Sequence, residues 1–172
     1  LEQLPALTEK QVLCEPSRRN TAPCIAYANY KIKEQNEDAL IVVAPSDHVI
    51  LNEDEFVRNI QSSLKAAKEN DWLLTLGIMP SRPDTGYGYI QFKEGEVYPA
   101  DDQLKKVKTF TEKPNLEIAK SFLESGDFLW NSGIFVWSLK SIMMAFENHL
   151  EDVDSLFKQG EGIYSTDAEK AF

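Results

Sequence analysis

The sequence lacks most features of membrane, secreted and nucleic-acid-binding proteins. No apolar run is long enough to span a bilayer, and the chain does not open on a signal-peptide pattern. Only 18 Lys and Arg stand against 28 Asp and Glu, whereas a nucleic-acid polymer requires a basic surface. The two cysteines are too few for a disulfide framework, and neither histidine has a partner at metal-site spacing. These absences predict a cytoplasmic protein that binds neither a membrane nor a nucleic-acid polymer.

The hydrophobic pattern predicts an α/β fold. The 172 residues, 42% of them hydrophobic, are enough to bury one core. Apolar segments of strand length, 39–44 and 72–78, flank an amphipathic helical pattern over 52–69. This strand–helix–strand order is typical of a parallel βαβ unit. We therefore expect a mostly parallel sheet flanked by helices.

One strand end is the first candidate for chemistry. Residues 39–44 form an unbroken apolar run, typical of a central parallel strand that is buried on both faces. Pro45 lacks a backbone donor and stops the strand, so that Asp47 follows just beyond its carboxyl end. Ligands of open α/β sheets bind at that edge. Asp47 is therefore the first candidate for a functional side chain.

The polar segment 15–23 precedes a helical pattern that runs to about Gln35. Arg19, Asn20 and Thr21 stand where this helix is expected to begin. A helix N-terminus with arginine nearby can hold a phosphate or a nucleobase. Ordinary capping by Asn20 or Thr21 in a solvated loop explains the same residues equally well.

Other polar residues interrupt or end predicted strands, and each has two interpretations. Gly88 either lets a ligand approach the backbone or marks a β-bulge, and the residues alone favour the bulge. Glu112 and Lys113 either grip a sugar hydroxyl and a phosphate or form a plain surface pair. Asn131 begins the polar triplet 131–133 inside an apolar strand. The triplet favours a cavity wall, with a hydrogen-bonded bulge as the alternative.

These segments belong to five motifs that follow one another along the chain. They are Glu15-Pro16-x-x-Arg19-Asn20-Thr21-Ala22-Pro23, Pro45-Ser46-Asp47-His48, Gly86-Tyr87-Gly88-Tyr89-Ile90, Phe110-x-Glu112-Lys113-Pro114 and Trp130-Asn131-Ser132-Gly133-Ile134-Phe135. Each is weak alone, but the series covers nearly the whole chain and closely resembles the bacterial mannose-1-phosphate guanylyltransferases, or GDP-mannose pyrophosphorylases. The resemblance implies a Rossmann-like, GT-A-like nucleotidyltransferase core. It also implies transfer of GMP from GTP to mannose 1-phosphate with Mg²⁺, giving GDP-mannose and pyrophosphate.

The resemblance assigns roles to eight residues. Asp47 corresponds to the carboxylate that binds the catalytic metal, and Lys113 to the catalytic lysine that faces the sugar phosphate. The other six correspond to residues that contact the substrates. Those that contact the guanosine end of GTP are Arg19, Asn20 and Thr21, and those that contact the sugar are Gly88, Glu112 and Asn131.

The family also has a glycine-rich phosphate loop, a second metal-binding aspartate and a C-terminal β-rich part that these 172 residues do not contain. The resemblance therefore implies that residues 1–172 are a partial sugar-phosphate nucleotidyltransferase domain, truncated at both ends and inactive alone. Two alternatives stay open: another sugar-1-phosphate nucleotidyltransferase, and a non-catalytic sugar-nucleotide-binding or regulatory domain. The sequence allows a homo-oligomer and does not say whether an isomerase domain is fused to the chain.

Overall fold

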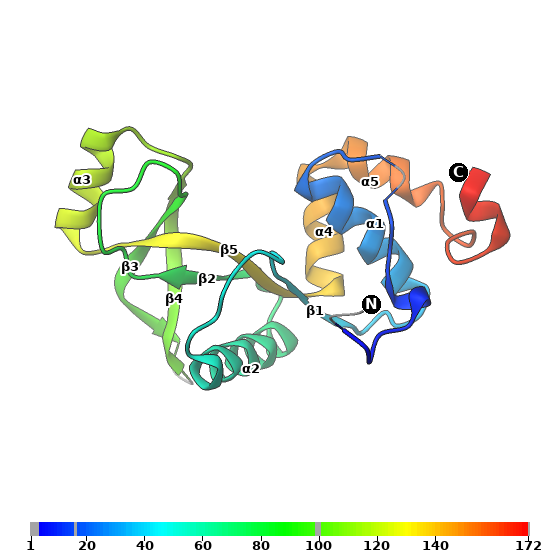
Figure 1. The fold of residues 1–172 in the computed structure, drawn as a ribbon, viewed down its shortest axis with the longest axis horizontal. Coiled ribbons are helices and arrows are strands. Elements are labelled where there is room, and N and C mark those ends of the chain that lie inside the picture. Colours follow the sequence, from blue (N-terminus) through cyan, green and yellow to red (C-terminus); the bar gives the residue numbers. More distant parts are fainter. Residues whose placement is uncertain (1–3, 16, 99–100, 172) are drawn as a thin grey trace. The chain divides into compact units, whose positions relative to one another are not determined.

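The computed structural model describes residues 4–15, 17–98 and 101–171, which form two compact units (Figure 1). The first unit comprises Leu1–Leu40 and Ser138–Phe172, and the second comprises Ile41–Trp137. No helix in the described ranges combines the length and the apolar character that a bilayer span requires.

The first unit is helical. It contains α1 (Thr21–Lys33), α4 (Leu139–His149), α5 (Glu151–Lys158) and the short 3₁₀ helices η1 (Glu9–Gln11) and η2 (Asp167–Ala171). Its three α-helices contact one another around buried residues, among them Ala26, Tyr30, Ile142 and Phe146. The Tyr30 hydroxyl donates to the buried Asp154 carboxylate at 2.8 Å. Burial and this hydrogen bond raise the pKa of Tyr30 far above its ordinary value, so the phenol stays protonated and ties α1 to α5.

The second unit is an α/β layer built on one sheet. Apart from the end residues Leu40 and Ser138, it contains β1 (Leu40–Val43), α2 (Glu53–Glu69), β2 (Leu74–Ile78), β3 (Tyr89–Tyr98), β4 (Asp101–Thr111), α3 (Leu116–Ser125) and β5 (Phe128–Ser138). The strand order is β1-β5-β3-β4, and β2 also pairs with β5. On the α3 side of the sheet, a core cluster joins Tyr89, Ala119, Phe128 and Trp130, with Phe122 packed against it.

Side-chain caps set the starts of the helices that follow strands or loops. Asn52 accepts from the Glu55 backbone at 3.3 Å, Asn115 from that of Ile118 at 3.0 Å, and Ser138 from that of Ser141 at 3.0 Å. Gly126 ends α3 with a φ of 78°, a left-handed conformation that glycine adopts without strain. These boundaries agree with the cap residues recognised in the sequence.

The α/β class is confirmed, but a mostly parallel sheet is not. The strand pairs whose directions the structure gives, β2 with β5, β3 with β4 and β3 with β5, are antiparallel. The expectation that residues 39–44 are buried on both faces is wrong. In β1, Leu40 and Val42 are exposed and Ile41 and Val43 are partly buried. The reason is that β1 ends the strand order with β5 as its one recorded neighbour.

Strands β2 and β5 approach closely at Gly77. A Cβ on Gly77 would lie 2.5 Å from Leu129 Cδ1 and 2.9 Å from Leu129 Cβ. We expect Gly77→Ala to lower the free energy of unfolding by about 1–3 kcal/mol, because a methyl group overpacks this contact. Urea unfolding followed by circular dichroism measures the loss. In a Leu129→Ala background the same change should cost less, and strictly additive losses would contradict the steric explanation.

Candidate active site

Gly88, Glu112 and Asn131 lie side by side on three neighbouring strands. Tyr89 of β3 pairs with Thr111 of β4 on one side and with Trp130 of β5 on the other. One step along these antiparallel pairs brings Gly88 opposite both Glu112 and Asn131. The Asn131 amide donates to the Gly88 carbonyl at 2.8 Å. The structure therefore brings together the three residues predicted to contact the sugar.

Gly88 makes room for the Glu112 carboxylate. A Cβ at position 88 would lie 2.7 Å from Glu112 Oε2 and 3.2 Å from Phe110 Cε1. The nearest irregularity of β3 in its pairing with β4 falls between Gln91 and Phe92, so the bulge favoured at Gly88 by the sequence is wrong. The glycine is required by the close approach of the Glu112 and Phe110 side chains.

Glu112 and Lys113 extend past the end of β4 into solvent. Lys113 Nζ lies 3.0 Å from Glu112 Oε1, and the two side chains are 63% and 58% exposed. Lys113 also has a φ of 42°, in the left-handed region that a lysine rarely adopts. Such a conformation costs about 1–3 kcal/mol and is concentrated at functional sites. The pair is thus a surface ion pair on a strained turn, with both charges accessible to a ligand.

The triplet that begins at Asn131 forms a hydrogen-bonded bulge in β5. Asn131 Oδ1 accepts from the Gly133 amide and from the Thr75 hydroxyl, each at 3.1 Å, and Ser132 Oγ donates to the Leu76 carbonyl at 2.7 Å. Strand register shifts here between β2 and β5, and Gly133 has a φ of 73°. The hydrogen-bonded bulge that the sequence left as the alternative is therefore present, with Asn131 Oδ1 and Ser132 Oγ bonded within the sheet. The Asn131 Nδ2 group has no acceptor among the described residues and stays available to a ligand.

We expect Asn131→Ala to lower the free energy of unfolding by about 1–3 kcal/mol, because the Gly133 amide loses its acceptor inside the bulge. The Thr75 hydroxyl keeps a second acceptor, the Ile134 carbonyl at 3.0 Å. Thermal unfolding of the 172-residue chain measures the loss. Asn131→Asp is the matched control, since it retains the accepting oxygen, and an equal loss in both variants would contradict the assignment.

Asp47 lies in a turn after β1, and its side chain is exposed. It forms no hydrogen bond or ion pair with any described residue. Within the described ranges, no group of three or more His, Cys, Asp or Glu side chains could hold a metal ion. A single carboxylate such as that of Asp47 can still contribute to a Mg²⁺ site, because this ion is often held by one or two carboxylates and completes its octahedron with water and substrate phosphates.

Arg19, Asn20 and Thr21 belong to the first compact unit, where they precede or begin α1. Asn20 is the N-cap, with a φ of 67°, but no side chain caps this helix. The capping interpretation of the loop is therefore wrong for this end of α1. The three exposed side chains make no hydrogen bond with the described residues and are free to contact a ligand.

Sequence reasoning missed the residues that hold the loop in front of Gly88. The Tyr89 hydroxyl donates to the Asp84 carbonyl at 2.9 Å and accepts from its amide at 3.0 Å. The Gly86 amide and the Arg82 guanidinium both bond the Asp84 carboxylate, and they lower its pKa. The Arg82 guanidinium lies 5.2 Å from the Trp130 ring. Side chains of successive residues in a strand point to opposite faces of the sheet. Tyr89 and Trp130, which hold the loop, therefore lie on the face opposite to that of Gly88 and Asn131.

The amino-acid sequence matches a known protein family over almost its whole length. The profile of the family described as nucleotidyl transferase matches residues 2–168. The chain belongs to the nucleotidyl transferase family. The chain is 39% identical over 149 residues to a mannose-1-phosphate guanylyltransferase of Escherichia coli, covering 84% of this chain and 32% of the relative. It is 35% identical to the alginate biosynthesis protein AlgA of Pseudomonas aeruginosa, covering 88% of this chain and 31% of that protein.

Solved structures agree with this family. The chain superimposes with a TM-score of 0.76 and 27% identity on a Thermus thermophilus protein described as mannose-1-phosphate geranyltransferase, over 89% of this chain and 43% of that one. A Helicobacter pylori protein described as mannose-6-phosphate isomerase gives a TM-score of 0.69 and 29% identity, over 81% of this chain and 50% of that one. The resemblance recognised in the sequence is confirmed. The chain spans about a third of the length of the curated relatives it matches, and the roles of its eight residues stay predictions.

Proposed function

We propose that this chain supplies the sugar-phosphate side of an enzyme that transfers GMP from GTP to mannose 1-phosphate. The observation that carries the proposal is the adjacency of Gly88, Glu112 and Asn131 on three strands, with Lys113 next to them. The similarity to proteins named mannose-1-phosphate guanylyltransferase supports this choice of substrates. The products are GDP-mannose and pyrophosphate.

The three strand residues are suited to a sugar ring. The Glu112 carboxylate accepts hydrogen bonds from sugar hydroxyls, and the free Asn131 Nδ2 donates to one. Gly88 lacks a side chain between them, so the ring can approach the backbone. Contacts of this kind fix the orientation of the sugar and hence of its phosphate.

Lys113 faces the phosphate of the sugar in this proposal. A phosphate oxygen of mannose 1-phosphate attacks the α-phosphorus of GTP, a new P–O bond forms, and the bond to the bridging oxygen of pyrophosphate breaks. Both reactants are anions, so the Lys113 ammonium lowers the repulsion between them and directs the approach. Its contact with Glu112 at 3.0 Å keeps the ammonium beside the sugar residues. No covalent enzyme intermediate is required.

Asp47 would hold Mg²⁺, and Arg19, Asn20 and Thr21 would contact the guanosine end of GTP. Bound Mg²⁺ supplies neutralisation of phosphate charge. The Asp47 carboxylate has no protein partner among the described residues, and neither do the three loop side chains, which is consistent with groups kept for ligands. We infer a cytoplasmic location from the proposed substrates, a nucleoside triphosphate and a sugar phosphate.

The test compares nucleotides with the full-length gene product. Mannose 1-phosphate is incubated with GTP, dTTP or UTP in the presence of Mg²⁺, and sugar nucleotides are separated by anion exchange. GDP-mannose should form fastest, and preference for a pyrimidine nucleotide would identify a different sugar-1-phosphate nucleotidyltransferase. Binding of GDP-mannose without turnover of any substrate would instead indicate a non-catalytic sugar-nucleotide-binding domain.

We expect the 172-residue chain alone to show no measurable turnover of GTP and mannose 1-phosphate. The glycine-rich phosphate loop implied by the family resemblance is not among its residues, so nothing equivalent positions the triphosphate. The same anion-exchange assay, applied to equal concentrations of the chain and the full-length gene product, checks this. Comparable rates from both would show that the chain is a sufficient enzyme.

A further inference from the structure

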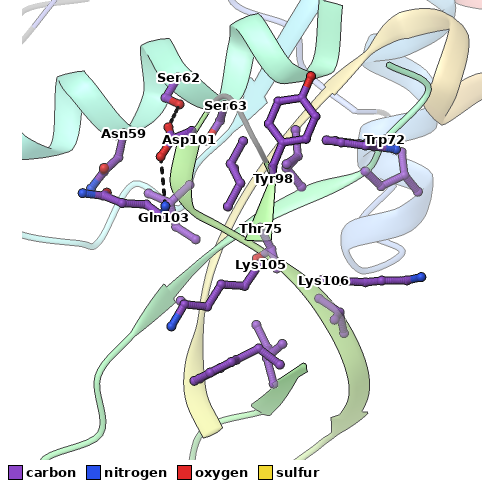
Figure 2. Close-up of a pocket in the computed structure, with 18 of the residues that line it drawn as sticks. Asn59, Ser62, Ser63, Trp72, Thr75, Tyr98, Asp101, Gln103, Lys105 and Lys106 are labelled. Atoms are coloured by element: carbon purple, nitrogen blue, oxygen red, sulfur yellow. Dashed lines mark hydrogen bonds between the residues drawn. The ribbon is translucent and has the colours of Figure 1, made fainter. Parts of the chain in front are cut away.

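A cavity of about 700 Å³ lies within the second compact unit, between α2, β2 and the β3–β4 pair (Figure 2). Small-molecule sites typically enclose about 300–1,000 Å³. None of the eight residues with proposed roles lines this cavity. It is therefore a separate candidate for a ligand.

The walls of the cavity are mainly apolar. Most of the apolar side chains that line it come from β2, the β3–β4 pair and β5, and they include Leu74, Leu76, Ile90, Phe92, Leu104 and Leu129. Trp72 and Tyr98 stand at its edge with their ring centroids 4.9 Å apart and their planes nearly perpendicular. A flat apolar ring can fill such a space with van der Waals contact on both faces.

Helix α2 contributes to the cavity lining polar side chains that have no hydrogen-bond partner among the described residues. Ser63 is only 6% exposed, and its hydroxyl has no hydrogen-bond partner among the described residues. The Asn59 amide, one turn earlier, also lines the cavity and has no partner in the described ranges. By contrast, the neighbouring Ser62 is bonded to Asp101, as Figure 2 shows. A ligand in the cavity would therefore give the Ser63 hydroxyl a hydrogen-bond partner.

Two lysines of β4, Lys105 and Lys106, and two acids, Asp71 and Asp101, line the cavity. Both Asp101 oxygens are engaged, one by Ser62 and one by the Gln103 amide at 2.9 Å, and these bonds lower the pKa of Asp101. Lys105 lies about 13 Å further along the strand. Its ammonium is 4.0 Å from the Phe92 ring centroid and forms no ion pair with a described carboxylate.

We propose that this cavity binds an aromatic anion. The ring system rests against the apolar wall and Phe92, the anionic group pairs with the Lys105 ammonium, and a polar atom of the ligand bonds Ser63. The apolar volume excludes a fully hydrated ion, and the Lys105 ammonium selects negative charge over positive.

The test uses 1-anilinonaphthalene-8-sulfonate, an aromatic sulfonate whose fluorescence rises in apolar surroundings. Titration of the folded 172-residue chain should show saturable binding of one molecule per chain. Lys105→Gln should weaken the affinity about tenfold, and Ser63→Ala about threefold. Lys120→Gln removes the same charge from an exposed position of α3 and should leave the affinity unchanged.

Thermal unfolding of each variant confirms that the fold is retained, so that weaker binding reports the cavity. Equal affinities in Lys105→Gln, Ser63→Ala and the unaltered chain would overturn the proposal, as would binding that never saturates. The full-length gene product should give the same order of affinities. If it binds no sulfonate while the shorter chain does, the cavity is filled in the native protein and the proposal fails.

Discussion

Asp47→Asn in the full-length gene product lowers the turnover of GTP and mannose 1-phosphate about 100- to 1,000-fold, the range typical of losing one preorganised electrostatic contact. An amide is a poor ligand for Mg²⁺ and removes a negative charge from the proposed metal site. The fold should be unaffected, because the Asp47 side chain is exposed and has no partner among the described residues. Steady-state kinetics at several Mg²⁺ concentrations and thermal unfolding measure the two effects.

Asp38→Asn is the matched control for this substitution. Asp38 is an exposed acid in the turn before β1, and its side chain also makes no hydrogen bond in the described chain. The control should keep the full rate and the same Mg²⁺ dependence. An unchanged rate in Asp47→Asn would mean that Asp47 is only a turn residue.

Gly88→Ala raises the KM for mannose 1-phosphate about tenfold and changes the free energy of unfolding by less than about 1 kcal/mol. The added methyl meets the far ends of two exposed side chains, Glu112 Oε2 at 2.7 Å and Phe110 Cε1 at 3.2 Å, which can move aside. Stability is therefore preserved, but the Glu112 carboxylate is displaced from the sugar. Kinetics of the full-length gene product and urea unfolding separate the two quantities.

The control for Gly88→Ala is a double-mutant cycle with Glu112→Ala. If the methyl acts by displacing the carboxylate, it should have little further effect on KM once that carboxylate is absent. Additive effects would show that the methyl blocks the sugar directly. A large loss of stability with an unchanged KM would contradict a role for Gly88 in the sugar site.

The sequence predicts the helices well because their ends depend on local chemistry. Asn52, Asn115 and Ser138 accept from backbone amides three residues later, and that spacing is visible in the sequence. The surroundings of β1 depend on β5, nearly a hundred residues later, which no local pattern reveals. For the same reason the strand–helix–strand order suggested a parallel unit of β1 and β2, whereas the structure gives β5 as a neighbour of both and pairs β2 with it antiparallel.

Local sequence patterns also predicted only part of the candidate site. Residue types at Gly88, Glu112 and Asn131 left two interpretations each, and only strand register shows that they are neighbours. Thr75 gave no signal, because a threonine in an apolar strand is ordinary, yet its hydroxyl bonds Asn131 Oδ1. The sequence likewise gave no sign that the polar residues of the cavity could bind a ligand, since single serines and lysines on amphipathic elements usually face solvent.

The bulge in β5 lies between two of the residues with proposed roles, Asn131 and Asp47. Asn131 begins the bulge, and a Cβ placed on Gly133 within it would lie 3.4 Å from Pro45 Cγ, two residues before Asp47. The bulge therefore begins at the proposed sugar contact and passes close to the segment that carries the proposed metal ligand. We expect a change in the length of this bulge to alter the distance between the two proposed sites.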